Sequence, residues 1–265
     1  MQDTSIIGKV ESLWRYPVKS MRGEKLTESF IGFSGVYGDR LFAVRNASGP
    51  KGFPYLTGRE EAEMLLYQPR FRHPDRAAMP PNLTEAEKIA PGLTPVYAHM
   101  EDLILDVETP SGKVLAVDDP ALLEMLGKDA RRALTVQRSD RAMTDCRPIS
   151  LFTVQTARQI GEEIGADIDK RRFRANIYVD LQSAAGFGED ALVGRRIRVG
   201  AKAEILILER DPRCKMISID PDTAEHNPEV LKKVSRAHEG KAGVYGAVLV
   251  EGLVRNGDPI EVLTA

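Results

Sequence analysis

The chain has 265 residues and a mass of 29.3 kDa, and 29% of its residues are charged, with 37 basic side chains against 39 acidic ones. This length supports one large core or two closely associated ones. Because the charges nearly cancel, no overall field would draw the chain to nucleic acid or to an anionic membrane, and we expect a site for a small molecule.

Cysteine usage indicates a reducing compartment, and the short apolar runs indicate a chain without a membrane span. Cys146 and Cys214 are too few for a disulfide framework, and no Cys-x-x-Cys or His-x-His pair supplies the ligands of a structural zinc. No apolar run approaches the ~20 residues that span a bilayer. Residues 1–4 (MQDT) lack the basic start and apolar segment of a signal peptide. We therefore expect a cytoplasmic protein without a membrane span.

Strand-like segments dominate the chain. They are short, rich in β-branched or aromatic residues, and bounded by glycine, proline or aspartate: residues 9–16, 41–45, 103–108, 177–180, 197–199, 203–208 and 247–250. Helical signals are stronger in residues 58–66, 120–126 and 153–164. This pattern predicts a mainly β protein with peripheral helices, of the α+β class.

Two segments interrupt the pattern. Residues 69–95 contain prolines without any clear period, which predicts an irregular excursion outside the core. The strand-like pattern stops again in the arginine-rich residues 126–148, just before the third helix. We place a domain boundary near residue 118, which divides the chain into residues 1–118 and 119–265.

Polar and basic residues follow two of the N-terminal strands, where a rigid scaffold presents side chains to a ligand. Pro17 directs the chain out of the first strand, and Lys19 and Ser20 then offer an ammonium and a hydroxyl that suit a phosphate or a carbonyl-rich ring. Arg40 precedes the next strand. Spacing alone favours a solvated lysine in a turn and a local salt bridge between Asp39 and Arg40.

A basic run precedes the strand-like residues 177–180. Arg171, Arg172 and Arg174 can form an anion receptor, and Asn176 supplies an amide donor and acceptor for recognising a ring. A solvated basic turn explains the run equally well. Because the run is short and lacks a stacking platform, a small anionic ligand is favoured over nucleic acid.

Cys214 directly follows a β-branched run and lies among Arg210, Arg213 and Lys215. These cations would favour the thiolate, which suits a soft metal or nucleophilic chemistry. A free cysteine is also often a small buried hydrophobe, and the residues by themselves leave both readings open. Cys146 lies in a loop, and we expect it to be buried or merely tolerated.

Five blocks occur in an order that resembles MOSC-domain proteins with an N-terminal MOSC β-barrel region, including the mitochondrial amidoxime-reducing component and its bacterial relatives. The blocks are residues 16–20 (YPVKS), 38–40 (GDR), 173–176 (FRAN), 213–214 with 220–223 (RC and DPDT), and 243–246 (GVYG). The resemblance covers nearly the whole chain. It implies a MOSC N-terminal β-barrel region in residues 1–118, a MOSC β-barrel domain in residues 119–265, and a molybdenum cofactor (Mo-molybdopterin) between them.

The resemblance also implies a site. Cys214 matches the catalytic cysteine that ligates molybdenum beside a pyranopterin dithiolene. The positions of cofactor contacts are occupied by Lys19, Ser20, Arg40, Arg147, Arg174, Asn176, Arg213 and Tyr245. A thiolate is a soft ligand for a high-valent metal, and cationic and amide groups suit an anionic pterin phosphate.

Three positions depart from the family pattern. Ala175 replaces a proline, Cys146 and Arg147 replace a Thr-Ser pair that contacts the cofactor, and Pro212 replaces a serine before the metal-binding block. These departures all fall close to Cys214 in the implied site. We therefore expect the surroundings of this cysteine to differ from those in its relatives.

The resemblance implies an oxidoreductase that reduces N-hydroxylated or related N-oxygenated small molecules. Its electrons would come from a separate donor protein of the iron–sulfur, flavin or haem type, because the chain lacks cysteines for a cluster. Pyridoxal phosphate binding is implied at the level of the family.

Two alternatives compete with the reductase. One is a sulfur or molybdenum-cofactor carrier that uses Cys214 without turning over an organic substrate, and the other is a β-barrel binding module without redox activity. The four histidines lie in no motif, so surface or hydrogen-bonded positions are expected for His73, His99, His226 and His238.

Overall fold

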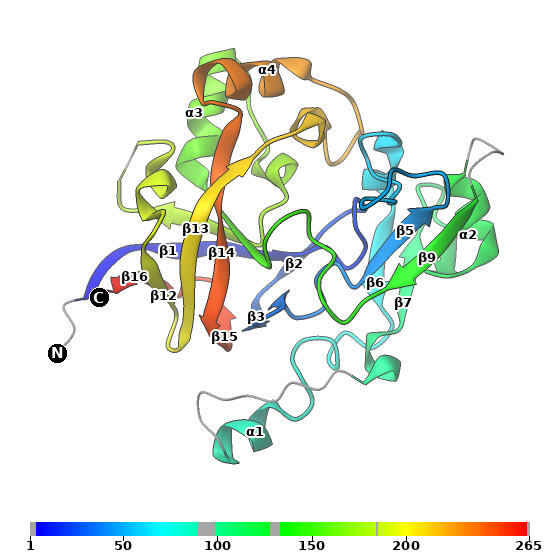
Figure 1. Ribbon diagram of the computed structural model, residues 1–265, viewed down its shortest axis with the longest axis horizontal. Coiled ribbons are helices and arrows are strands. Elements are labelled where there is room, and N and C mark those ends of the chain that lie inside the picture. The colour runs from blue at the N-terminus through cyan, green and yellow to red at the C-terminus, as the bar shows by residue number, and fades with distance from the viewer. Residues whose placement is uncertain (1–3, 90–98, 128–132, 184, 264–265) are drawn as a thin grey trace.

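The computed structural model describes residues 4–89, 99–127, 133–183 and 185–263 (Figure 1). Strands dominate this part of the chain. The strands are β1 (Thr4–Arg15), β2 (Glu24–Leu26), β3 (Glu28–Gly32), β4 (Gly35–Val36), β5 (Phe42–Asn46), β6 (Gln68–Phe71), β7 (Leu105–Glu108), β8 (Val114–Ala116), β9 (Leu134–Arg138), β10 (Ile149–Thr153), β11 (Ile177–Leu181), β12 (Arg196–Val199), β13 (Ala203–Pro212), β14 (Lys241–Val250), β15 (Gly252–Arg255) and β16 (Pro259–Leu263).

Helices connect and cover these strands. The α-helices of the described residues are α1 (Leu83–Ile89), α2 (Pro120–Leu126), α3 (Val154–Ile164) and α4 (Pro228–Ala237). Short 3₁₀ helices are η1 (Ala62–Leu66), η2 (Met100–Leu103), η3 (Lys170–Phe173), η4 (Gly188–Leu192) and η5 (Lys215–Ser218). The structure is therefore mainly β with peripheral helices, as the sequence predicts.

A closed barrel forms one half of the molecule. Its strands follow the order β11-β10-β14-β13-β12-β16-β1, and β1 pairs again with β11. Neighbours are antiparallel except β10 and β11, which are parallel and are joined by α3. Side chains such as Val10, Ile149, Ile205 and Val244 fill the interior. Burial alternates along most of β13, because successive strand residues point to opposite faces.

The residues between β1 and β10, which we call the N-terminal region, have a core of their own. Met21, Phe42, Met64 and Leu105 belong to it, and it is bounded by the pair β5–β9 and the sheet β6-β7-β8. Figure 1 shows this region beside the barrel. The chain crosses between the halves, because β1 completes the barrel and the late strand β15 pairs with β3. The boundary near residue 118 stays a prediction.

The helices α3 and α4 lie together over one end of the barrel (Figure 1). Thr153 caps α3 by accepting a hydrogen bond from the Thr156 amide, and Gly165 ends the helix in a left-handed conformation. Ala157 and Ile160 of this helix are buried in a separate small core. No helix in the described ranges is both long and apolar enough to cross a bilayer.

Two expectations about local structure are wrong. Residues 58–66 form a turn followed by the 3₁₀ helix η1, because Met64 and Leu65 anchor only its last part in the core. The proline-rich excursion contains β6 and α1, and it buries Phe71, Ala77 and Leu83. Pro69 is accommodated because β6 is an edge strand. Residues 90–95 of the excursion and 128–132 of the arginine-rich segment lie outside the described residues.

Candidate functional site

A pocket of about 100 Å³ lies where the barrel meets the N-terminal region. All of the site residues expected from the sequence line it: Lys19, Ser20, Arg40, Arg147, Arg174, Asn176, Arg213, Cys214 and Tyr245. We call it the Cys214 pocket. Its walls also contain residues that the sequence analysis did not select, among them Arg59, Asp145 and Asp211.

The pocket is strongly basic. Seven of its lining side chains are basic and two are acidic: Lys19, Arg40, Arg59, Arg147, Arg172, Arg174 and Arg213 against Asp145 and Asp211. Focused charge of one sign in a cleft raises the local concentration of ligands of the opposite sign. The site therefore suits an anionic ligand.

Cys214 lies where β13 gives way to η5, and its side chain is partly buried. Its carbonyl accepts a hydrogen bond from the Ile217 amide at 3.2 Å, which closes the turn into η5. Cys146, by contrast, is exposed, which agrees with the second of the two expected readings, a tolerated loop cysteine. Its Sγ lies 3.5 Å from Glu209, and partial burial together with this carboxylate raises the pKa of the Cys146 thiol.

Tyr16 forms a platform for two arginines of the pocket. The guanidinium carbons of Arg40 and Arg174 lie 4.8 and 4.2 Å from the centre of its ring. Arg40 also forms an ion pair with Asp39 and donates to the Arg174 carbonyl at 3.1 Å. The expected salt bridge of Arg40 is thus present, and the same residue lines the pocket.

Arg174 differs from its neighbours because its charge is not paired. Its Nη2 is buried without a hydrogen-bond partner among the described residues, and burial lowers the pKa of Arg174 to about 10. The backbone is also unusual here: Ser20, Arg40 and Arg174 have φ angles of 66°, 47° and 52°. Left-handed conformations at non-glycine residues cost energy and concentrate at functional sites.

Lys19 is buried, with 5% exposure, so the solvated-turn reading of this lysine is wrong. Its Nζ donates to the Met143 carbonyl at 2.9 Å and forms an ion pair with Asp145. Phe53 and Tyr55 cover it at 5.0 and 5.6 Å from their ring centres. Burial lowers the pKa of Lys19, and the Asp145 carboxylate opposes that shift.

Arg213 is held by three contacts below Cys214. It donates to the carbonyls of Ala242 at 2.6 Å and Phe173 at 2.9 Å. Its Nη2 lies 2.7 Å from Asp211, as an ion pair without hydrogen-bond alignment. Gly243 makes this packing possible, because its φ is 78° and a Cβ there would lie 2.9 Å from Nη2.

Asp211 is the acidic group buried deepest in the pocket wall, with 2% exposure. Burial raises its pKa to about 6, although Arg213 and the Tyr245 phenol favour the ionised form. Burial and the nearby Asp211 carboxylate in turn raise the pKa of Tyr245. The pocket therefore contains a carboxyl group that changes protonation near pH 6, well above the usual range of an aspartate.

Two other expected contacts are engaged within the protein. Asn176 accepts hydrogen bonds from the amide and hydroxyl of Ser150 at 3.3 and 3.2 Å, and it donates to the Trp14 carbonyl at 3.3 Å. Arg147 is half exposed, and its Nε lies 2.7 Å from Glu209. Asn176 thus ties β1, β10 and β11 together at the pocket floor.

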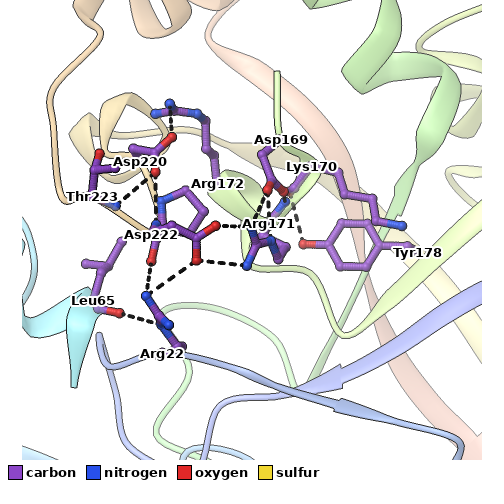
Figure 2. Close-up of polar contacts among 11 residues, drawn as sticks. Arg22, Leu65, Asp169, Lys170, Arg171, Arg172, Tyr178, Asp220, Asp222 and Thr223 are labelled. Atoms are coloured by element: carbon purple, nitrogen blue, oxygen red, sulfur yellow. Dashed lines mark hydrogen bonds and ion pairs between the residues drawn. The ribbon is translucent and has the colours of Figure 1, made fainter. Parts of the chain in front are cut away.

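The block of residues 220–223, which the resemblance to the family included, does not line the pocket but contributes to an ion-pair network beside it (Figure 2). Asp222 binds Arg171 and lies 3.4 Å from Arg22 of the N-terminal region. Asp220 lies 2.7 Å from Arg172. This network joins the two halves of the molecule, and it accounts for two of the three arginines that precede β11.

Metal-ligand clusters are not a feature of the site. In the described ranges, no group of three or more histidine, cysteine, aspartate or glutamate side chains is placed to hold an ion. His238 is engaged elsewhere, at 2.8 Å from Glu163 and stacked on Phe187.

Fold and site together define a β-barrel protein with a basic, cysteine-containing pocket against an N-terminal region. Residues 7–147 match the MOSC N-terminal beta barrel domain, and residues 138–261 match the MOSC domain. The first match covers more than half of the chain. The chain therefore belongs to the family of MOSC proteins with this N-terminal domain, which confirms the resemblance seen in the sequence.

Curated relatives are distant. The chain is 27% identical, over 94% of its length, to "Molybdenum cofactor sulfurase" of Drosophila grimshawi, but it spans only 34% of that protein. It is 22% identical, over 97% of its length, to "Mitochondrial amidoxime-reducing component 1" of Mus musculus and covers 83% of it. Among solved structures, the YUAD protein from Bacillus subtilis is 16% identical with a TM-score of 0.49 over the whole of both chains.

Proposed function

We propose that the chain is a molybdenum-cofactor-binding oxidoreductase that reduces N-hydroxylated or related N-oxygenated small molecules. The observation that carries the proposal is the position of the Cys214 thiol in a pocket with an excess of basic side chains. Relatives named for molybdenum cofactor sulfuration and for amidoxime reduction support it. The chain spans about a third of the sulfurases, so an activity of the whole sulfurase is not assumed.

The residues of the pocket fit such a cofactor. Cys214 offers a thiol that is partly buried but accessible from the pocket, and a thiolate is a suitable molybdenum ligand. Arg174 offers a buried guanidinium nitrogen without a partner, which an anionic group of the cofactor would satisfy. When bound, the molybdenum cofactor supplies two-electron redox chemistry. Lys19, Ser20, Arg40, Arg147, Asn176, Arg213 and Tyr245 are the proposed further contacts.

Side chains of the pocket would bind the anionic ligand and hold a proton for the reaction. Lys19 is oriented by the Met143 carbonyl and is neutralised by Asp145, so an anionic ligand would compete with Asp145 for this ammonium. Reduction of an N–OH group to N–H with release of water consumes two protons. Asp211 can hold one on its carboxyl up to about pH 6, because burial raises its pKa to about 6. We propose Asp211 as a proton-holding residue of the site.

A carrier role is the second candidate function. In it, Cys214 would hold sulfur or the cofactor without reducing an organic substrate, and the sulfurase matches over 94% and 92% of the chain favour it. A separate electron-donor protein of iron–sulfur, flavin or haem type belongs to the reductase proposal alone. Pyridoxal phosphate binding and a cytoplasmic location stay predictions.

The test uses the full chain made in a host that synthesises molybdenum cofactor. We expect stoichiometric molybdenum, release of pterin, and reduction of a hydroxylamine or amidoxime with an artificial electron donor. Cys214→Ser should lose the molybdenum and the activity. Cys146→Ser is the matched control, because Cys146 is the other cysteine and does not line the pocket. Molybdenum-free protein with a persulfide on Cys214 would instead support the carrier.

A further inference from the structure

A second, larger cavity has Asp39 in its wall, whereas the adjacent Arg40 lines the Cys214 pocket. Its volume is about 740 Å³, within the range of ~300–1,000 Å³ that small-molecule sites occupy. It is bounded by the hairpin β3–β4, by the segment around α1 and by Glu251, which follows β14. We call it the hairpin cavity. Figure 1 shows α1 below β3 and β15, at the end of the molecule farthest from α4.

Two polar side-chain atoms in residues that line this cavity lack partners in the described part of the chain. Glu251 is 4% exposed, and its Oε1 accepts a hydrogen bond from the Phe33 amide at 3.0 Å, whereas its Oε2 is buried without a partner among the described residues. The hydroxyl of Tyr37, a residue with 8% exposure, is likewise buried and unpartnered. Native proteins pair nearly all such atoms, because an unpaired one costs about 1–3 kcal/mol.

The charges that line the cavity are mostly negative. Asp39, Glu85, Asp140 and Glu251 contribute carboxyl groups, and His99 is the one basic type among the described lining residues. Asp39 is already paired with Arg40, and Asp140 lies 3.8 Å from Arg138. Glu251 has no such ion pair in the described part of the chain, and burial raises its pKa. A bound cation would counteract that burial by favouring the ionised carboxylate.

The rest of the wall is apolar. Phe30, Val36, Leu41 and Leu103 line the cavity and are buried, while Phe33 lines it and is 55% exposed. An exposed aromatic ring beside an apolar cavity provides contact area for the body of a ligand. Its face also attracts cations.

We propose that the hairpin cavity binds an organic ammonium, with an apolar or aromatic body against the phenylalanines and a protonated amine at Glu251. An ammonium group has N–H donors and no acceptor, so it can satisfy an unpaired carboxylate oxygen or phenol oxygen. The Glu251 carboxylate would repel a carboxylate ligand, and a purely apolar ligand would leave both orphaned atoms unpaired. This site is independent of the cofactor proposed for the Cys214 pocket.

The test is calorimetric titration of the full-length protein at pH 8 and low salt with three probes of similar size. 2-Phenylethylammonium should bind with saturation, whereas 2-phenylethanol and 3-phenylpropanoate should bind at least tenfold more weakly. Equal binding of the ammonium and the neutral probe would overturn the proposal, as would the absence of saturable ammonium binding.

Two variants locate the site. Glu251→Gln keeps an oxygen that can accept from Phe33 but removes the charge, and it should weaken ammonium binding at least tenfold. Ser34→Arg changes an exposed lining residue and adds a repelling cation, so it should weaken binding similarly even if the buried substitution unfolds the protein. Glu225→Gln, an exposed acid outside the cavity, is the matched control and should bind as the wild type does. Binding that survives Ser34→Arg in a folded protein would show that the site lies elsewhere.

Discussion

The Cys214 pocket and the ion-pair network of Asp220 and Asp222 are built from arginines of the same short run. In the network, Arg171 and Arg172 each meet at least one carboxylate, and Arg22 joins them from the N-terminal region (Figure 2). Two residues farther along, Arg174 faces the pocket with an unpaired nitrogen. Within this run, carboxylates hold Arg171 and Arg172, and Arg172 also lines the pocket. Arg174 meets no carboxylate among the described residues.

The carboxyl groups of the two regions also differ in their acidity. Burial raises the pKa of Asp211 in the pocket wall, whereas the hydrogen bond from Arg171 lowers the pKa of Asp222 in the network. In the pocket, loss of water outweighs the attraction of nearby cations. In the network, direct pairing outweighs partial burial. A basic environment therefore does not by itself determine the charge state of an acidic side chain.

The largest expected difference between the regions is the effect of Asp211 on how the free energy of unfolding depends on pH. Its pKa is about 6 in the folded protein against 3.8 ordinarily, so the folded state binds more protons than the unfolded state between these values. Stability should therefore fall as pH rises from about 4 to 6, by at most about 3 kcal/mol at ~1.4 kcal/mol per unit. Urea unfolding of wild type and Asp211→Asn measures this difference, and parallel pH curves would contradict it.

Asp220→Asn should destabilise the protein through the network without weakening phosphate binding in the Cys214 pocket. Arg172 is 8% exposed and would lose its carboxylate, so we expect a loss of about 2 kcal/mol, below the ~3–5 kcal/mol of a fully buried pair. Asp220 keeps an oxygen for the amides of Asp222 and Thr223 in this variant. Chemical unfolding gives the loss, and inorganic phosphate titration should show undiminished affinity. A variant as stable as the wild type would remove the structural role assigned to the pair.

Arg174→Gln should produce the opposite result. Loss of a largely buried charge without a carboxylate partner among the described residues should stabilise the ligand-free protein by less than about 1 kcal/mol, because the side chain retains some exposure and its contact with the Tyr16 ring is lost. Phosphate affinity should fall about tenfold, the equivalent of ~1.4 kcal/mol, because a charge-assisted hydrogen bond is lost. Thermal unfolding and calorimetry measure both effects. Arg158→Gln, an exposed arginine outside the pocket, is the control and should change neither.

The smallest expected effect belongs to Asp222→Asn. This carboxylate is exposed, and exposed ion pairs contribute about 0.2–1 kcal/mol. Because the pKa of Asp222 is lowered on folding, its contribution is present above the ordinary pKa of 3.8 and is lost as the pH falls. The pH dependence of stability due to Asp222 is therefore opposite in sign to that due to Asp211. The free energies of unfolding of the wild type and Asp222→Asn, measured at pH 7 and near pH 3, check this prediction. A stability loss in the variant that grows toward acid pH would contradict it.

Local patterns predicted much of the fold but missed particular elements. The expected strands all overlap strands of the structure, since β-branched residues between turn formers are a short-range signal. Helix α4 was not expected, although Asn227 caps it and Pro228 stands at its first turn. The irregular excursion was predicted from prolines, charged residues and small residues without a clear period. Burial of Phe71 and Leu83 depends on distant residues that a local pattern does not contain.

In the candidate site, too, some features were predicted from the sequence and others depend on distant residues. The expected contacts were selected by matching motif blocks, and the structure brings all of them into one pocket. Asp145 and Asp211 were missed although they stand beside selected residues, because nothing in the sequence indicates that Asp145 meets Lys19 or that Asp211 is buried. Their roles depend on pairing and dehydration, which are properties of the assembled fold.

The sequence by itself determined that this is a β-rich chain with balanced charge, and it determined the order of blocks that carries Cys214 among basic residues. Only the tertiary structure decided which of those cations are neutralised. Arg172 meets Asp220 from 48 positions away, and Lys19 meets Asp145 from 126 positions away, while Arg174 meets no carboxylate in the described residues. The physical reason is that an ion pair forms only within a few ångströms, and the closed barrel determines which distant residues come that close.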